Sequence, residues 1–203
     1  MLKPLTNTLQ NVINFTWPMV IISIVILASF RICFLIKTKQ KIVLYKELSM
    51  LIFGVYILTL FQVVTFQDDV SWSSNNFIPF REIMRYNITS RLFIKNVLGN
   101  MIMFLPFGFF TSYFLRVEKI HLPIILILIA SISIEIVQMI IGRVFDVDDI
   151  LLNIIGGILG FFVYKMFRLF SKKFPNICKK EWFLNLMSVI VLISLIILIV
   201  IIL

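Results

Sequence analysis

The sequence contains little cysteine, histidine, glycine or proline, and few charged residues. Two cysteines, Cys33 and Cys178, and one histidine, His121, in 203 residues argue against a disulfide-linked scaffold and against a zinc site. Seven glycines and six prolines argue against a collagen-like or disordered chain. Charged residues make up 14% and apolar residues 61%, whereas soluble domains have about 25% and 45–50%. The composition therefore indicates a membrane protein.

Six apolar segments reach or approach the roughly 20 helical residues that cross a bilayer. They are residues 15–36, 48–66, 97–115, 122–141, 150–167 and 182–203. The strict alternation of apolar and polar residues that marks half-buried strands does not recur along the chain. We therefore expect an all-α, polytopic bundle of about six transmembrane helices, which forms a single membrane domain over residues 1–203.

The basic residues predict the orientation of this bundle, because cytoplasmic loops carry an excess of lysine and arginine. Six spans place 13 of the 19 basic residues on one side of the membrane. We expect that side to be cytoplasmic, with both termini and the segments 67–96 and 142–149 outside. The basic residues that give the net charge of +9 then flank the apolar spans, and we expect no nucleic-acid partner.

Polar residues within the predicted spans gather near their outer ends. Glu135 is the only acid well inside a span, roughly 9 Å below the outer boundary, and Gln138 lies on the same helical face. The fifth span begins with Asp146, Asp149 and Asn153, whose i, i+3, i+7 spacing places them on one helical face. Asn100 stands where the third span begins. Because charges in lipid are costly, such residues indicate a functional site.

Four short motifs occur in order along the second half of the chain. They are Asn76-Phe-Ile-Pro-Phe80; Gly99-Asn100 with Pro106-Phe-Gly108; Glu135-x-x-Gln138; and a run with Arg143, Asp146, Asp148, Asp149, Asn153, Gly156, Gly157 and Gly160. Together they resemble the VanZ-like family over about residues 76–164. Residues 15–36 and 182–203 then form accessory spans.

The resemblance implies a multi-pass protein of the bacterial plasma membrane, of the type linked to teicoplanin resistance. Teicoplanin is a glycopeptide that carries a lipid tail and binds cell-wall precursors outside the membrane. The resemblance implies this phenotype but no particular reaction. It also adds Asn76 to the candidate ligand-binding residues.

Two interpretations of the carboxylates are open. Glu135 is either a general acid or base, or a buried acid that pairs with Arg143 or Asn100. Asp146 and Asp149 are further catalytic candidates, and with Glu135 they could hold Mg²⁺ or Ca²⁺. Alternatively, aspartates at the start of the helix cap it.

The candidate ligand-binding residues share amide, carboxylate or guanidinium side chains near the outer surface. They are Asn76, Arg81, Asn100, Gln138, Arg143, Asp148 and Asn153. Interhelical hydrogen bonds would explain Asn100 and Asn153 equally well. Arg81 would bind the phosphate of a lipid head group or belong to a solvated loop.

Two function hypotheses follow. In the first, the protein binds membrane lipids and a lipid-linked cell-wall precursor or lipoglycopeptide at the outer leaflet, without catalysis. In the second, it is a membrane-embedded hydrolase or transferase that acts on a lipid-linked, phosphate-bearing substrate, with Glu135 as acid or base. A transporter is disfavoured because the inner half of the spans lacks polar groups.

Overall fold

The computed structural model describes residues 3–65, 75–87, 90, 92–174 and 180–202. The chain divides into two compact units, one formed by Met1–Gln67 with Phe174–Leu203 and the other by Asp68–Lys173. Within the described residues the regular structure is helical, and the only β-type pairing is an isolated bridge between Asn76 and Asp146. The predicted all-α bundle is confirmed.

The first unit contains α1 (Lys3–Thr38), α2 (Leu44–Thr65) and α8 (Glu181–Ile202). Arg31 on α1 donates to both carboxylate oxygens of Glu47 on α2, at 2.8 and 3.0 Å. This paired geometry compensates the two charges within apolar helices. Cys33 is a free, exposed thiol, and Cys178 lies outside the described residues.

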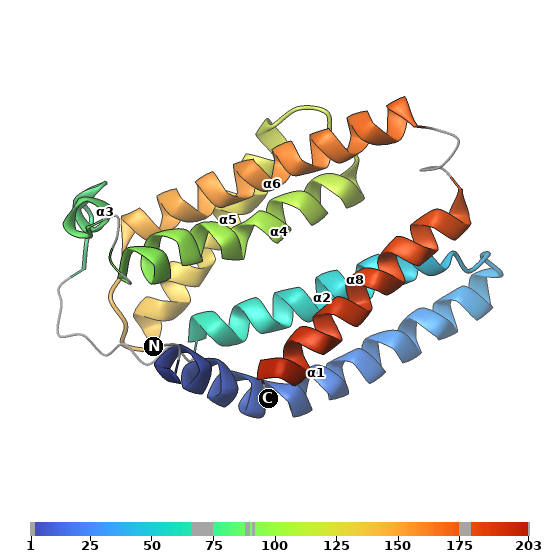
Figure 1. Ribbon diagram of the computed structural model, residues 1–203, viewed down its shortest axis with the longest axis horizontal. Helices are drawn as coiled ribbons and strands as arrows, with labels where there is room; N and C mark the ends of the chain where they lie inside the picture. The colour runs from blue at the N-terminus through green and yellow to red at the C-terminus, as the bar shows by residue number, and fades with distance from the viewer. Residues whose placement is uncertain (1–2, 66–74, 88–89, 91, 175–179, 203) are drawn as a thin grey trace. The chain divides into compact units, whose positions relative to one another are not determined.

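The second unit contains a short helix α3 (Arg81–Arg85), a π-helical segment η1 (Phe93–Leu98), α4 (Gly99–Leu115), α5 (His121–Ile140) and α6 (Val147–Lys173). The helices α4 and α6 start at the end of the unit where α5 finishes (Figure 1). The first residues of α4 and α6 and the last residues of α5 therefore lie at the same end of the unit.

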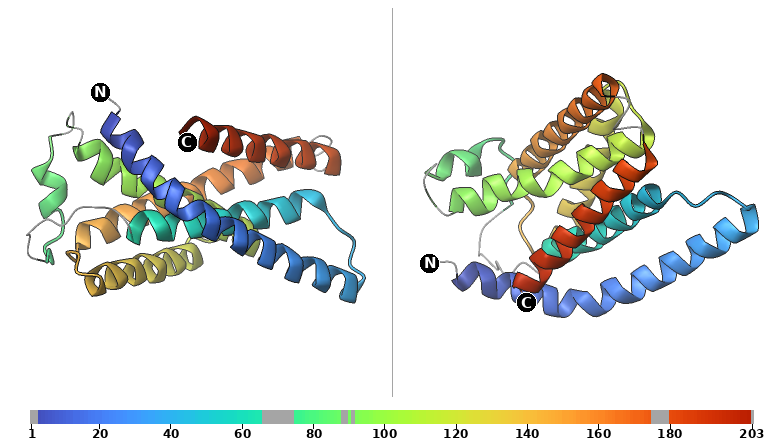
Figure 2. Two further views of the ribbon diagram at one scale, coloured as in Figure 1. Left: turned by 90° about the horizontal axis from the view of Figure 1, so that it is seen from below. Right: turned by 45° about the vertical axis from the view of Figure 1, so that its right-hand side comes forward.

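Glycines allow α4 and α6 to pack backbone against backbone (Figure 1, Figure 2). A Cβ atom added to Gly156 would lie 2.1 Å from the carbonyl oxygen of Met101, and one added to Gly160 would lie 2.0 Å from that of Leu105. Only glycine permits such an approach, as in other small-xxx-small helix pairs in membranes.

The turn between α5 and α6 begins with a glycine in the left-handed region. Gly142 has φ +86°, and the N–H of Arg143 donates to the carbonyl oxygen of Gln138 at 2.9 Å. This arrangement ends a helix at a positive-φ glycine and satisfies a carbonyl of its last turn. It also directs residues 143–146 back toward the start of α6.

Five described segments are long and apolar enough to cross a membrane, namely Ile21–Thr38, Leu44–Phe61, Asn96–Leu115, His121–Ile140 and Val147–Lys173. They match the first five predicted spans. The sixth predicted span falls on α8, whose Glu181–Ile193 part is an apolar helix of shorter length. The chain is thus a multi-pass membrane protein, and its division into a single domain with accessory spans stays a prediction.

Candidate functional site

Side chains from four segments of the second unit meet at the end where α5 finishes and α4 and α6 start. Most of the sequence-predicted site residues lie there, from Asn76 before α3 to Asn153 on α6. Some of these side chains form hydrogen bonds with backbone N–H groups, and others form hydrogen bonds only with other side chains. This distinction decides which of them are available to a ligand.

Glu135 lies at the centre of this end, and only 1% of its surface is exposed. Its Oε2 accepts a hydrogen bond from the backbone N–H of Asp146 at 2.9 Å. In the orientation that satisfies its neighbours, the Gln138 amide donates to Glu135 Oε1 at 3.0 Å and accepts from Arg143 Nη1 at 2.9 Å. Gln138 therefore links the buried carboxylate to the half-buried guanidinium, as the i, i+3 spacing predicts.

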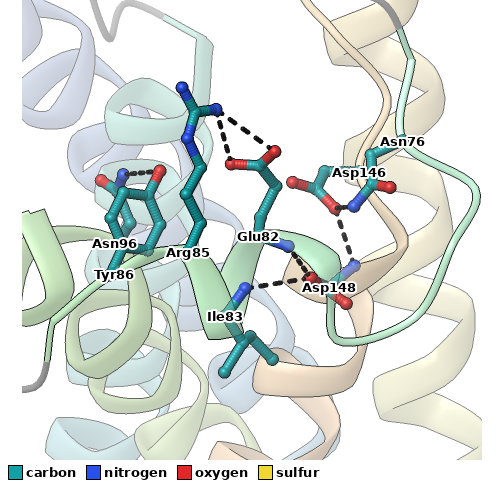
Figure 3. Close-up of polar contacts among 8 residues, drawn as sticks. All are labelled: Asn76, Glu82, Ile83, Arg85, Tyr86, Asn96, Asp146 and Asp148. Atoms are coloured by element: carbon teal, nitrogen blue, oxygen red, sulfur yellow. Dashed lines mark hydrogen bonds and ion pairs between the residues drawn. The ribbon is translucent and has the colours of Figure 1, made fainter.

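Asp146 caps α6 and holds the segment that precedes α3. Its Oδ1 accepts from the N–H of Asp148 at 2.8 Å, which is a side-chain cap of the first helical turn, and from Asn76 Nδ2 at 2.9 Å (Figure 3). The backbone of Asn76 also pairs with residues 145–147. Its N–H donates to the carbonyl oxygen of Phe145 at 2.8 Å, and its carbonyl oxygen accepts from the N–H of Val147 at 3.1 Å. Burial raises the pKa of the Asp146 carboxyl.

Asp148 is buried and binds the start of α3. One carboxylate oxygen accepts from the N–H of Phe80, and the other accepts from the N–H groups of Glu82 and Ile83, at 2.7 and 3.2 Å. Figure 3 shows the latter two contacts. The first N–H groups of a helix have no partner within it, so a carboxylate stabilises them. These contacts are structural, and a ligand-binding role for Asp148 stays a prediction.

Asn100 and Asp149 join α4 to α6 at the same end. The Asn100 amide donates to Asp149 Oδ1, and both residues are half-buried. Asp149 also interacts electrostatically with Glu135, Asp146 and Arg143. The predicted convergence of carboxylates, an amide and an arginine from separate segments is thus present in the structure.

A second polar layer lies one helical turn deeper. Asn153 follows Asp149 by four residues on α6, and Ser131 precedes Glu135 by four residues on α5, so each is about 6 Å further from the end. Asn153 Nδ2 donates to Ser131 Oγ at 2.9 Å, but Asn153 Oδ1 is buried and accepts no hydrogen bond from the described residues. Below this layer Ile127 packs against Gly157.

Arg81 and the metal hypothesis receive less support. Arg81 is exposed at the start of α3, and its side chain forms no hydrogen bond or ion pair with the described residues. No group of three or more histidine, cysteine, aspartate or glutamate side chains within the described ranges is placed to hold a metal ion. A Mg²⁺ or Ca²⁺ site built from Glu135, Asp146 and Asp149 therefore stays a prediction without geometric support.

Two polar contacts at this end involve residues outside the predicted site. Ser131 is fully buried beneath the site, and its place four residues before Glu135 was the available signal. Tyr86, which follows α3, accepts a hydrogen bond at its hydroxyl from Asn96 Nδ2 at 3.0 Å (Figure 3). No spacing rule predicts that contact, because it joins an irregular segment to η1.

Comparison with known protein families identifies a match. The sequence model of the VanZ/LLP1 family matches residues 48–168, which is more than half of the chain and includes most of α2 as well as the polar end of the second unit. Searches of curated proteins and of solved structures found no match.

Proposed function

Because the chain belongs to the VanZ/LLP1 family, we propose that its polar end binds the head of a lipid-linked cell-envelope ligand. The ligand is a cell-wall precursor or a lipoglycopeptide, held at the outer leaflet of the bacterial plasma membrane. Binding there lowers the access of a lipid-tailed glycopeptide such as teicoplanin to its target. The protein thereby contributes to resistance without catalysing a reaction.

Asn153 Oδ1 is the observation that carries this proposal. A buried carbonyl oxygen without a donor costs about 1–3 kcal/mol, and such atoms are rare in folded proteins. The oxygen is buried one turn below Asp149, with Asn100 beside Asp149 at the half-buried level above. A hydroxyl or amide N–H of a ligand would supply the missing hydrogen bond. The sugar and peptide parts of envelope precursors and glycopeptides carry many such donors.

The half-buried residues above Asn153 suit the entrance of such a site. Asn100, Arg143 and Asp149 keep part of their surface exposed, whereas Glu135 and Asn153 are buried. A guanidinium binds phosphate oxygens in a fixed, charge-assisted geometry. Arg143 is therefore the residue that would bind the phosphate of a lipid-linked ligand, while Asn153 Oδ1 would accept a hydrogen bond from the ligand deeper in the site.

The distribution of charge supports an extracytoplasmic location for this end. Six spans place 13 of the 19 basic residues on the side opposite this end, and cytoplasmic loops carry an excess of lysine and arginine. The polar end then faces the leaflet in which a lipoglycopeptide inserts its tail.

One observation favours a second candidate function, a membrane-embedded hydrolase or transferase. The Glu135 carboxylate lies next to the Gln138 amide, whose oxygen accepts from Arg143. A buried carboxylate close to a phosphate-binding guanidinium has the composition of an acid–base site for a lipid-linked phosphate. In that case Glu135 would move a proton, and Arg143 would orient the substrate.

The proposal is tested by measuring the survival of bacteria that carry equal amounts of each variant in the membrane. Wild type, Asn153→Leu and Asp149→Asn are expressed in a susceptible bacterium and exposed to teicoplanin, and to vancomycin, which lacks the acyl tail. Ser133→Ala is the matched control, because Ser133 lies on α5 but is exposed and donates only to the carbonyl of Ile129. We expect both site variants to lose teicoplanin protection, with the vancomycin response unchanged.

Protection that persists in both site variants, at normal abundance and melting temperature, would refute the binding site. The enzyme is tested in the same strains with Glu135→Gln, by profiling membrane lipids and wall precursors. A precursor or lipid that wild type converts and Glu135→Gln does not would favour the enzyme. An unchanged profile would favour binding alone.

A further inference from the structure

The opposite end of the second unit concentrates positive charge around a single carboxylate. Glu118 lies in the connection between α4 and α5, and its Oε1 accepts from Arg168 Nη2 on α6 at 2.6 Å. Glu118 also interacts electrostatically with Lys165 and Lys172. These three basic residues are spaced i, i+3, i+7, so they share one face of α6.

This carboxylate neutralises only part of the charge on that face. Arg168 holds the pKa of the Glu118 carboxyl below its usual value, so the carboxylate is ionised at neutral pH. One negative charge faces three positive ones, which leaves a surplus from Lys165 and Lys172. A surplus of one sign on a restricted surface attracts an anion.

The surface beside this face is apolar and hollowed. Glu118 and Lys165 line a shallow, open hollow together with Ile120, Phe161 and Phe162. Phe162 is 53% exposed, and the Lys165 ammonium lies 5.6 Å from the centre of the Phe161 ring. A soluble anion would contact only the basic edge, whereas a phospholipid would also place an acyl chain along the aromatic wall.

We infer that the α4–α5 connection and α6 form a binding site for an anionic phospholipid, with its phosphate at Lys165 and Lys172 and an acyl chain against Ile120 and Phe162. Basic pockets between transmembrane helices on the cytoplasmic side bind lipid head groups in this way. Glu118 limits the affinity by occupying Arg168. The site lies at the other end of the helices from Glu135, so it is independent of the proposed resistance function.

The test uses the purified full-length chain in a neutral detergent. Melting temperature is followed during titration with phosphatidylglycerol, phosphatidylcholine or inorganic phosphate, since a ligand of the folded state raises it. We expect a saturable rise with phosphatidylglycerol only. Each lysine near a lipid surface contributes about fivefold in affinity, so Lys165→Gln with Lys172→Gln should weaken the response by about 25-fold.

Two further variants separate a site from general surface charge. Glu118→Gln releases Arg168 and should strengthen phosphatidylglycerol binding, although it breaks an ion pair. Arg116→Gln removes the same charge from an exposed residue at the same end that does not line the hollow, and should leave the titration unchanged. Equal losses in Arg116→Gln and the lysine variants, or an equal rise with phosphatidylcholine or inorganic phosphate, would overturn the inference.

Discussion

Substitution of Gly156 by alanine should disturb the polar end through helix packing alone. The added Cβ would lie 2.1 Å from the carbonyl oxygen, 2.7 Å from the carbonyl carbon and 2.8 Å from the Cα of Met101. Ordinary contacts of this kind start at about 3.4 Å, so α4 and α6 must separate by more than about 1 Å at this level. Backbone atoms cannot move aside as a flexible side chain does.

That separation reaches the site because Met101 directly follows Asn100. The hydrogen bond between Asn100 and Asp149 joins the same two helices, and an increase of about 1 Å exceeds the range of a good hydrogen bond. Overpacking costs about 1–3 kcal/mol. We therefore expect Gly156→Ala to lower the melting temperature in detergent and to weaken teicoplanin protection.

Gly99→Ala is the matched control, because its added Cβ would meet only the carbonyl oxygen of Ile94 at 3.8 Å. Alanine is about 1 kcal/mol better than glycine inside a helix, so this variant should be neutral or slightly stabilising. Thermal unfolding of the two purified variants, measured side by side, decides the matter. If Gly156→Ala melts at the same temperature as Gly99→Ala, the backbone-contact argument is refuted.

Three further predictions follow from the same end. Asp148→Ala removes the acceptor for the N–H groups of Phe80, Glu82 and Ile83 at the start of α3, and a lost cap costs about 0.5–2 kcal/mol. Hydrogen exchange at these three residues should become about tenfold faster while α5 stays protected, and unchanged exchange would contradict the role. Burial raises the pKa of Asp146 above 3.8, so its stabilising contribution is full below that pH and is lost as pH rises through the folded-state pKa. Asp146→Asn should therefore gain stability relative to wild type as pH rises above about 4. If the melting temperatures of the two proteins change with pH in parallel, the prediction is wrong. Because no three ligating side chains in the described ranges are placed to hold a cation, EDTA should leave the melting temperature unchanged; a rise with Mg²⁺ or Ca²⁺ that Asp149→Asn abolishes would show the opposite.

The spans and the meeting of the polar residues could be predicted from the sequence. Apolar length identifies helices such as His121–Ile140 because lipid requires it. Spacing then places Glu135 with Gln138, and Asp149 with Asn153, on common helical faces. The antiparallel order of consecutive spans brings these faces to one side of the membrane.

Contacts that depend on irregular segments could not be predicted. Asp148 precedes Asp149 by one residue, yet it turns toward α3 and binds its backbone, while Asp149 turns toward Asn100. The difference depends on how residues 75–80 fold back over the start of α6, which no periodicity records. For the same reason the sequence does not predict the hydrogen bond between Tyr86 and Asn96.

The hydrogen bonds lead to one further expectation about which substitutions affect resistance directly. Asn76 and Asp148 bind backbone groups, so their loss should act through folding and lower membrane abundance. Among the described residues the Asn153 side chain hydrogen-bonds only to the Ser131 hydroxyl, so its loss should reduce protection at equal abundance. Asp146 belongs to both sets, because its side chain caps α6 while its N–H donates to Glu135. A proline at position 146 would remove that N–H; if protection per molecule then stayed normal, the Glu135 carboxylate would not need this donor, and the site would begin at Asn100 and Asp149.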